Sequence, residues 1–503
     1  VTILAEFLLE GRMVEQHRPF TRTVVDEAGW IAAAEALAAG RWTLLGLWGE
    51  AKAVHMALFE APGTIGVVSL EGLSGSYPSV ARHHPPALRL ERTVRDLFGL
   101  EPVGLPDPRP WLDHGRWGVR APLGTAEPAS DAGRAYAFLP AEGEGLHQIP
   151  VGPVHAGIIE PGHFRFTVNG ETIVRLEARL GYVHKGIEGL MAGAGISRAA
   201  QLAGRTSGDS TVAYSLAFAN AVEAAIGFEA PPRAVWLRAL MAELERLANH
   251  LGDIGAICND AAFPLMLAHC GVLREKVLRA ADAAFGHRLM RDRIAPGGVT
   301  VDLEGSGIAA IRQVVVDIRR RFPPLVELYE NTASLQDRTV TTGVLKPQLA
   351  RQYGAGGYAG RASGRSFDAR HVLRYAPYDR LIFDVPVFAE GDVNARVWVR
   401  IREVEQSLSI VDQLLDLLPD GPIAVPVPDL GRTCEGAALV EGFRGDILVW
   451  LRLSADSTVE RCHLRDPSWF QWPVVEVAIE GNIVADFPLC NKSFNCSYSG
   501  QDL

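Results

Sequence analysis

The sequence lacks an uninterrupted apolar run of 18 or more residues, and so it predicts no helix that crosses a membrane. Its beginning is interrupted by Glu6, Glu10 and Arg12, a pattern that does not indicate a signal peptide. The six cysteines form no CxxC pair, which is typical of a reducing compartment and provides no zinc or iron–sulfur ligand set. We therefore expect a soluble, intracellular protein that meets a membrane only through a partner.

Two further features restrict the function. No glycine-rich fingerprint follows a predicted strand, so we expect no NADH binding of the Rossmann type. The net charge of −10 argues against nucleic acid as a partner. A chain of 503 residues with 48% hydrophobic and 21% charged residues is typical of a globular protein that is too long for one core, so we expect two or three domains.

The first part of the chain has the patterns of a small α+β domain. Asp26 is a fitting N-cap for a helix that Gly40 would end, because apolar residues recur between them at helical spacing. Glycines separate three strand-like runs, and a second helical pattern follows them. We assign this domain to residues 1–122 and a linker rich in Pro and Gly to residues 123–150. The predicted elements are helices at 26–40 and 88–100 and strands at 41–49, 52–60 and 64–72.

Residues 151–503 have a different pattern, in which helices dominate. An Asn-Gly pair at 169–170 joins two strand-like runs and indicates a hairpin. Behind the prolines at 231–232, leucines repeat at helical spacing, and similar repeats occur at 308–322 and 401–415. Such repeats are typical of helices that pack lengthwise in a bundle. The predicted fold class is therefore α+β, in which the small N-terminal domain is followed by a large helical bundle with peripheral β-structure.

Four polar clusters interrupt this apolar sequence. In the first, GPVHAGIIEPGHFRF, glycines and prolines hold His155, Glu160 and His163 beside a predicted strand. Two histidines and a carboxylate can transfer protons near neutral pH, but they equally suit a surface loop with hydrogen-bonded histidines. In the second, LGYVHKGIEGL, burial of Glu188 would raise its pKa and make it a proton carrier, whereas an ion pair with Lys185 would make it structural.

The third cluster, RTSGDSTVAYS, gathers hydroxyls and a carboxylate at the start of an apolar helix. Asp209 or Ser210 would cap that helix, which accounts for one of these polar residues but not for all of them. The fourth cluster is the tail, FPLCNKSFNCSYSGQDL. Chain ends usually fray, but this one has many aromatic residues and few charges, which favours a packed tail.

These clusters, in this order, resemble the large subunit of nickel–iron hydrogenases and its relative, the quinone-side subunit of respiratory complex I. The likeness runs from about residue 151 to 503, and residues 91–123 resemble the neighbouring complex I subunit. The chain thus resembles the fused C/D-type subunit of some bacterial complex I and of membrane-bound, energy-converting hydrogenases. The segments that carry the resemblance are GPVHAGII, GYVHKGIEGLM, PPRAVWLRALMAELERLANHL, APGGVTVDL, GRASG and AEGDVNARVWVRIREVEQSL.

In nickel–iron hydrogenases, four cysteine thiolates hold the metals, because soft sulfur ligands suit nickel and iron. The first pair has the pattern Arg-x-Cys-Gly-x-Cys, and this sequence has Ser207 and Ser210 at both cysteine positions. The second pair, Asp-Pro-Cys-x-x-Cys, aligns best with residues 491–496, which puts Ser493 at one position and leaves Cys496 as a lone thiol. The resemblance therefore implies that the metal ligands are lost, and we expect no bound metal and no hydrogenase activity.

The resemblance to complex I implies instead that a quinone occupies the former metal cavity and is reduced by an iron–sulfur cluster of an adjacent small subunit. The chain departs from complex I at Ile159, near the family's second histidine, for which His163 is a shifted substitute. The family's quinone-binding tyrosine aligns near Gly208 or Asp209, and neither residue can replace a phenol. Glu188 matches the proton-transfer position of the hydrogenase pattern Arg-Gly-x-Glu. The expected catalytic residues are His155, Glu188, Arg205 and Asp209, and the expected cofactor-binding residues are His155, His163, Ser207 and Ser210.

We accordingly expect a peripheral-arm subunit of an NADH-quinone oxidoreductase-like complex, on the cytoplasmic side of the inner membrane, that takes part in proton-coupled electron transfer. The implied partners are an iron–sulfur small subunit of the complex I B type, a ferredoxin-like iron–sulfur subunit, and membrane subunits of the H and antiporter types. The alternative is a non-catalytic scaffold or conformational-coupling subunit of an ion-translocating complex. The missing tyrosine favours the scaffold, whereas a dense polar cavity favours electron transfer, because an unpaired buried polar group costs about 1–3 kcal/mol.

Overall fold

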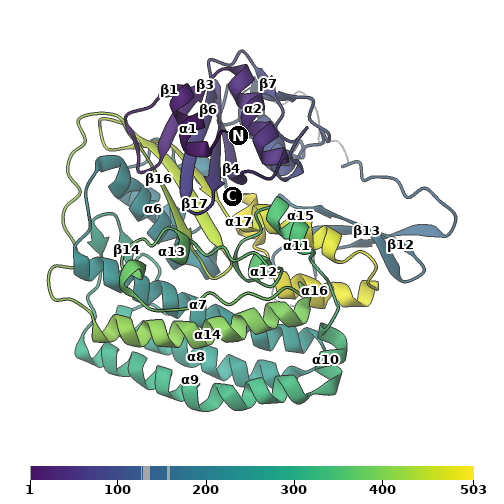
Figure 1. The fold of residues 1–503 in the computed structure, drawn as a ribbon, viewed down its shortest axis with the longest axis vertical. Coiled ribbons are helices and arrows are strands. Elements are labelled where there is room, and N and C mark those ends of the chain that lie inside the picture. Colours follow the sequence, from purple (N-terminus) through teal and green to yellow (C-terminus); the bar gives the residue numbers. More distant parts are fainter. Residues whose placement is uncertain (1, 126, 129–135, 156–158) are drawn as a thin grey trace.

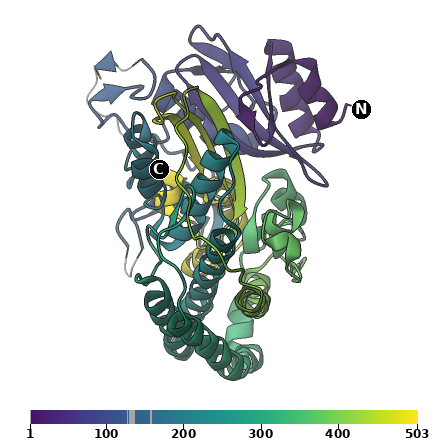
Figure 2. The same cartoon turned by 90° about the vertical axis from the view of Figure 1, so that its left-hand side faces the viewer.

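The structure is a computed structural model that describes residues 2–125, 127–128, 136–155 and 159–503. In Figure 1 the N-terminal domain lies at the top, long helices lie side by side at the bottom, and strands of the C-terminal part lie between them. Figure 2, turned by 90°, shows the same separation of the purple domain from the green helices. The predicted fold class, a small α+β domain followed by a helical bundle with peripheral β-structure, is confirmed.

The N-terminal domain is built on a five-stranded sheet in the order β1-β3-β6-β5-β4. Its three long strands bury nearly every side chain on both faces, so both faces need a cover. Helix α2 begins where predicted, because the Asp26 carboxylate accepts a hydrogen bond from Gly29 N at 2.8 Å. The elements of this part are α1 (Leu4–Glu10), β1 (Arg12–Met13), β2 (His17–Arg18), β3 (Thr21–Val25), α2 (Glu27–Ala38), β4 (Thr43–Glu50), β5 (Ala53–Glu60), β6 (Thr64–Glu71), β7 (Ser76–Pro78), α3 (Leu88–Phe98), β8 (Glu101–Val103), β9 (Val119–Arg120) and β10 (Glu127–Pro128).

A second sheet, in the order β18-β17-β16-β2, joins the two parts of the chain. Its strands β16 (Cys434–Glu441), β17 (Asp446–Leu453) and β18 (Val459–Arg465) are C-terminal, but β2 pairs with β16 in parallel. The two sheets contact each other through aromatic rings: the Trp48 ring lies 5.0 Å from that of His463 and 5.4 Å from that of Trp450. The N-terminal domain is therefore packed onto the sheet that carries part of the candidate site.

The bundle consists of long helices whose apolar residues form its seam (Figure 1). In α7 the leucines that repeat at helical spacing are all buried, as the sequence predicted. The four long helices are α7 (Pro232–Asp260), α8 (Pro264–Phe285), α9 (Gly305–Asn331) and α14 (Val393–Asp416). Around them lie α4 (Ile187–Met191), α5 (Ile196–Ala203), α6 (Thr211–Ile226), β14 (Ile294–Ala295), β15 (Gly298–Val299), α10 (Ala333–Thr339), α11 (Pro347–Gln352), α12 (Gly357–Arg361) and α13 (Ala369–Val372).

A three-stranded sheet, β11-β12-β13, projects at the edge of the molecule (Figure 1). Strands β12 (His163–Asn169) and β13 (Thr172–Arg179) form the predicted hairpin, and Gly170 between them has φ 59°, which glycine adopts without strain. Strand β11 (Leu146–Val151) pairs with β12, so the last residues of the predicted linker belong to a sheet. Residues 126 and 129–135 of that linker lie outside the described residues, and the domain boundaries stay a prediction.

The C-terminal tail is packed inside the molecule, in agreement with its composition. Helices α15 (Ser468–Ala478), α16 (Phe487–Phe494) and α17 (Tyr498–Asp502) lie between the N-terminal domain and the bundle (Figure 1). Every residue of α17 is buried. Among the residues that the structure describes, no helix is long and apolar enough to cross a membrane.

Candidate functional site

The loop between α5 and α6 carries the third polar cluster, and its polar side chains do not cap the helix. Ser210 occupies the N-cap position but makes no capping hydrogen bond, so the predicted cap was wrong. The Glu245 carboxylate of α7 accepts the hydrogen bonds of Val212 N at 2.7 Å and Ala213 N at 3.1 Å instead. Burial raises the pKa of Glu245 to about 8. Asp209 and its neighbouring serines are thereby free for other contacts.

Asp209 is held by an arginine that sequence reasoning did not identify. Arg444, in the turn between β16 and β17, donates from Nη2 to Asp209 Oδ2 at 2.6 Å, and Ser207 Oγ donates to Oδ1 at 2.8 Å. Burial raises the pKa of the Asp209 carboxyl, but Arg444 and Ser207 outweigh this effect and hold the pKa below its usual value. The side chain still keeps 39% of its exposure, so water reaches the ionised carboxylate.

Serine hydroxyls extend from Asp209 into the C-terminal tail. Ser207 Oγ lies 2.9 Å from Ser497 Oγ, which in turn lies 3.5 Å from Ser499 Oγ. An ionised carboxylate only accepts hydrogen bonds, so Ser207 points its one proton at Asp209, and Ser497 then donates to Ser207. We call Asp209, Ser207, Ser497 and Ser499 the hydroxyl chain. Its hydrogen bonds run in one direction, toward the carboxylate.

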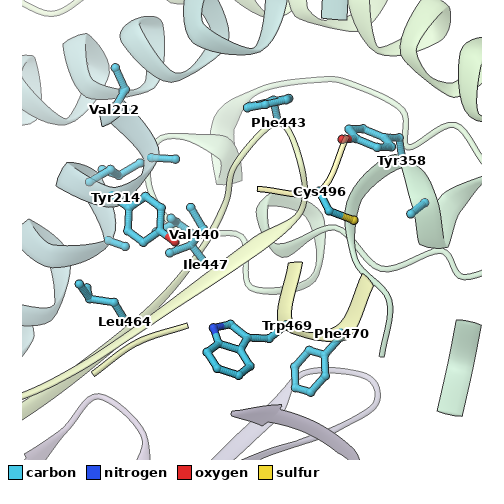
Figure 3. Packing of buried hydrophobic residues seen from close by; sticks show 14 of the residues in the cluster. Val212, Tyr214, Tyr358, Val440, Phe443, Ile447, Leu464, Trp469, Phe470 and Cys496 are labelled. Atoms are coloured by element: carbon cyan, nitrogen blue, oxygen red, sulfur yellow. The ribbon is translucent and has the colours of Figure 1, made fainter. Parts of the chain in front are cut away.

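Ser493 and Cys496, the tail residues that the resemblance aligns with the hydrogenase cysteine pair, contact groups other than Ser207. Ser493 Oγ accepts a hydrogen bond from Arg396 Nε at 2.9 Å, and Cys496 lies in the buried apolar cluster that contains Tyr358 and Trp469 (Figure 3). Helix α16 ends at Asn495, whose φ of 45° turns the chain. Because of this turn, Ser497 rather than Cys496 or Ser493 meets Ser207.

A second buried carboxylate, Asp466, packs against the same tail. The Tyr214 hydroxyl donates to Asp466 Oδ2 at 2.6 Å, and Ser497 N donates to Ser468 Oγ at 2.8 Å. A Cβ atom added to Gly500 would lie 2.3 Å from Asp466 Oδ2, so this position accepts no side chain without a shift. The backbone of the tail is therefore fixed by its close approach to Asp466.

Glu188 is buried as anticipated, but its pKa changes in the opposite direction from the one expected. Burial raises the pKa of this carboxyl, yet the nearby charges of Arg461 and His463 outweigh burial and lower it to about 2. Glu188 Oε2 lies 2.7 Å from Arg461 Nη1, and Oε1 lies 2.9 Å from His463 Nδ1. The partner of the alternative interpretation, Lys185, contacts Ser499 O at 3.3 Å instead. Glu188 is therefore an ionised, fully paired group near neutral pH.

The loop that contains His155 lies against the hydroxyl chain. Glu160 Oε2 accepts a hydrogen bond from Ser499 N at 2.9 Å. Both ring nitrogens of His155 are buried without a hydrogen-bond partner among the described residues, and burial lowers the pKa of this imidazole. The neutral ring can donate one hydrogen bond and accept another. Residues 156–158, which follow His155, lie outside the described residues.

The other two predicted residues have partners of their own. His163 Nδ1 donates to Gly152 O at 3.1 Å, and Arg165 Nε donates to His163 Nε2 at 3.4 Å. Arg205 pairs with Asp292 through Nη2 and Oδ2 at 2.7 Å, which raises the pKa of the guanidinium. Among the hydrogen bonds of the described residues, none joins either side chain to Asp209. The roles assigned to the predicted site residues stay predictions.

Hydroxyls and carboxylates, rather than thiolates, surround the place where the loop and the tail meet. Ser207, Ser210 and Ser497 are poor ligands for nickel and iron, because a serine hydroxyl stays protonated near neutral pH and offers hard oxygen. These residues do not fit a nickel–iron centre. The unpartnered nitrogens of His155 do fit a quinone carbonyl, which accepts a hydrogen bond.

A cavity of about 110 Å³ lies beside Asp209 and is also lined by Glu245 and Asn249. Asn249 Nδ2 donates to Asp209 O and to Glu245 O, both at 2.9 Å, which fixes the loop on α7. The sequence did not identify Glu245 and Arg444 as site residues. Glu245 lies on the buried face of α7, and Arg444 lies in a turn that contains Gly442 and Gly445. Only contacts between distant segments reveal their place in the site.

Comparison with protein families defines the class of the chain. Residues 261–434 match the family model of the 49 Kd subunit of respiratory-chain NADH dehydrogenase. Residues 51–132 match the model of the 30 Kd subunit of the same enzyme. The chain thus combines two subunit types of respiratory-chain NADH dehydrogenase in one polypeptide.

Individual relatives agree with this class. Formate hydrogenlyase subunit 5 of Escherichia coli (strain K12) is 33% identical over 450 residues, which cover 86% of this chain and 78% of the relative. The carbon monoxide-induced hydrogenase of Rhodospirillum rubrum is 32% identical over 354 residues, which cover 69% and 97%. A chain of the membrane-bound sulfane sulfur reductase, an archaeal respiratory membrane complex, is 27% identical with a TM-score of 0.68, covering 72% of this chain and 99% of that one. The chain belongs to the family of the fused 30-kDa and 49-kDa complex I subunits and their hydrogenase relatives, as the sequence resemblance predicted.

Proposed function

We propose that this chain is the subunit of a membrane-bound, complex I-like oxidoreductase in which protons reach a reduced quinone through the hydroxyl chain. Its relatives are subunits of respiratory and hydrogenase complexes of membranes, which supports a peripheral-arm oxidoreductase subunit. Reduction of a quinone takes up two electrons and two protons. The electrons come from an iron–sulfur cluster of a partner subunit, and this chain supplies the path for the protons.

The observation that carries the proposal is the unbroken series of hydroxyls from Asp209 into the tail. Ser497 donates to Ser207 and Ser207 donates to Asp209, over 2.9 and 2.8 Å. In this relay Asp209 takes a proton from water and passes it to Ser207, and each serine hydroxyl hands its own proton to the next, toward Ser499 and the loop of His155. The hydroxyls then turn back to point at the carboxylate, ready for the second proton. His155 is the group that meets a quinone carbonyl, because its ring nitrogens are buried and have no partner among the described residues.

The same family relationship supports the finer assignment of partners. An iron–sulfur small subunit of the complex I B type would face the loop and the tail, and a ferredoxin-like subunit would supply electrons to it. Membrane subunits of the H and antiporter types would hold the chain at the cytoplasmic side of the inner membrane. Ser207, Ser210 and Ser493 stand, in this proposal, where hydrogenases have the thiolates that hold their metals.

One observation favours the alternative, a scaffold without catalysis of its own. Glu188, at the position of the hydrogenase proton carrier, is enclosed by Arg461 and His463, so protonation there would break an ion pair in a fully buried place. A chain that kept only structural contacts at this position would serve assembly or conformational coupling. The two candidates make different predictions for the hydroxyl chain.

The decisive experiment uses the intact, detergent-purified complex. Its iron–sulfur clusters are reduced anaerobically, a short-chain quinone is added, and cluster reoxidation is followed by EPR in H₂O and in D₂O. Asp209→Asn and Ser207→Ala should slow reoxidation roughly a hundredfold and change the solvent isotope effect, because they break the proton path. Ser215→Ala is the matched control, since Ser215 Oγ donates only to Thr211 O of its own helix at 2.8 Å. Unchanged reoxidation in both site variants would reject the relay and leave the scaffold.

A further inference from the structure

A separate pocket of about 370 Å³ lies where the N-terminal domain meets the C-terminal part. Leu97 of α3 forms one wall, Trp117, Val119 and Leu123 form a second, and His184 and its neighbours form the third. The volume is at the lower end of the range for small-molecule pockets, about 300–1,000 Å³. None of the four residues of the hydroxyl chain lines this pocket.

His184 is held in one tautomer at the pocket wall. Its Nδ1 lies 2.6 Å from the carbonyl oxygen of Asp502, and a carbonyl can only accept, so Nδ1 carries the hydrogen. Burial lowers the pKa of His184, which keeps the ring neutral near neutral pH. Nε2 is therefore an acceptor, and no described side chain donates a hydrogen bond to it.

The ring of His184 is also fixed in orientation. The Trp117 ring stacks on it at 4.7 Å with an angle of 23° between the planes. The carboxylate of Glu188, which reaches the pocket wall, is already occupied by Arg461, His463 and the amide of Leu464. Lys185 also lines the pocket, and its ammonium donates to Ser499 O at 3.3 Å. His184 Nε2 is thus a fixed acceptor opposite the apolar side chains of Leu97, Val119 and Leu123.

We propose that this pocket binds a planar aromatic alcohol, whose hydroxyl donates to His184 Nε2 while its ring lies among Leu97, Val119 and Leu123. A hydroquinone head group belongs to this class of ligands. A quinone has carbonyl acceptors and no donor, so His184 Nε2 favours the hydroxylated over the oxidised form. The inference depends on the pocket and on His184 alone, and it holds whether or not the hydroxyl chain carries protons.

The test uses two probes, 1-naphthol and its methyl ether 1-methoxynaphthalene, in which a methyl group replaces the hydrogen that is donated. Their binding to the full chain is measured by titration calorimetry at neutral pH. We expect 1-naphthol to bind about fivefold more tightly, the effect of one neutral hydrogen bond. Equal affinities, or tighter binding of the methyl ether, would overturn the proposal.

Three variants locate the binding. His184→Phe keeps a ring for Trp117 and removes the acceptor, so the preference for 1-naphthol should vanish while 1-methoxynaphthalene binding stays within about twofold. Val119→Trp fills the pocket and should weaken both probes more than about tenfold. Asp209→Asn should change neither affinity, which separates this pocket from the hydroxyl chain. A preference that persists in His184→Phe refutes the assignment, even where Val119→Trp does not fold.

Discussion

The buried Glu245 makes the stability of this protein depend on pH in a way that a single substitution removes. Its carboxylate accepts two backbone hydrogen bonds at the start of α6, yet burial raises its pKa from 4.5 to about 8. A carboxyl whose pKa is higher in the folded than in the unfolded chain contributes its full stability below pH 4.5. That stability is lost as the pH rises through 8.

The magnitude follows from the shift. One pKa unit corresponds to about 1.4 kcal/mol, so the full range from pH 4.5 to 8 and above involves about 5 kcal/mol. Between pH 6 and 9 the folded chain loses nearly the whole proton on Glu245, which costs roughly 2–3 kcal/mol. Glu245→Gln cannot lose a proton, and its amide keeps one acceptor and one donor, like the protonated acid.

The assay is urea unfolding of wild type and Glu245→Gln at pH 6 and at pH 9, because other titrating groups cancel in the double difference. Wild type should lose roughly 2–3 kcal/mol more than the variant between these pH values. Glu460→Gln, which changes an exposed carboxylate, should follow wild type. Parallel pH profiles of wild type and Glu245→Gln would refute the assignment of a raised pKa.

Two further predictions follow from close contacts. Glu188→Gln should destabilise the fold by about 3 kcal/mol at pH 7 and by less at pH 3. The reason is that the stability contributed by a carboxyl with a pKa of about 2 is present above pH 4.5 and is lost as the pH falls through 2. Urea unfolding at both pH values measures this difference, and a destabilisation that grows toward acid would contradict it. Gly500→Ala should lower the free energy of unfolding by about 1–3 kcal/mol, because its Cβ would overlap the Asp466 carboxylate. Gly271→Ala in α8, where a Cβ meets nothing within 4 Å, should be neutral or stabilising. Thermal melts of both glycine variants measure the difference.

Local patterns predicted the elements of the fold well. Asp26 caps its helix, the Asn-Gly pair forms its hairpin, and the leucines of α7 form a buried seam, since each depends on neighbours a few residues away. The pairing of β2 with β16 was not predicted, because it joins residues about four hundred positions apart. The sequence of a strand at the edge of a sheet does not show which distant strand will pair with it.

The candidate site could be predicted only in part, for the same reason. The loop at 205–211 and the tail were singled out correctly as polar clusters, and the structure brings them together at Ser207 and Ser497. The contact between Ser207 and Ser497 was not predicted, because the turn at Asn495 redirects the tail and no spacing rule predicts such a turn. The predicted sign of the pKa shift of Glu188 was wrong. The sequence suggested that Glu188 is buried, but it did not show that Arg461 of β18 lies beside it.

Glu188, which is buried, and Asp209, which is partly exposed, therefore have different roles, which their surroundings decide. Glu188 contacts Arg461, His463 and the amide of Leu464, and these contacts connect α4 to β18. Protonation of Glu188 would break an ion pair in a region of low dielectric constant. Asp209 has a single arginine, keeps part of its exposure and receives a directed row of hydroxyls. If protons pass through this chain, they pass by Asp209, and a variant of Glu188 acts through stability. A complex in which Glu188→Gln abolishes the solvent isotope effect while Asp209→Asn leaves it intact would reverse these roles.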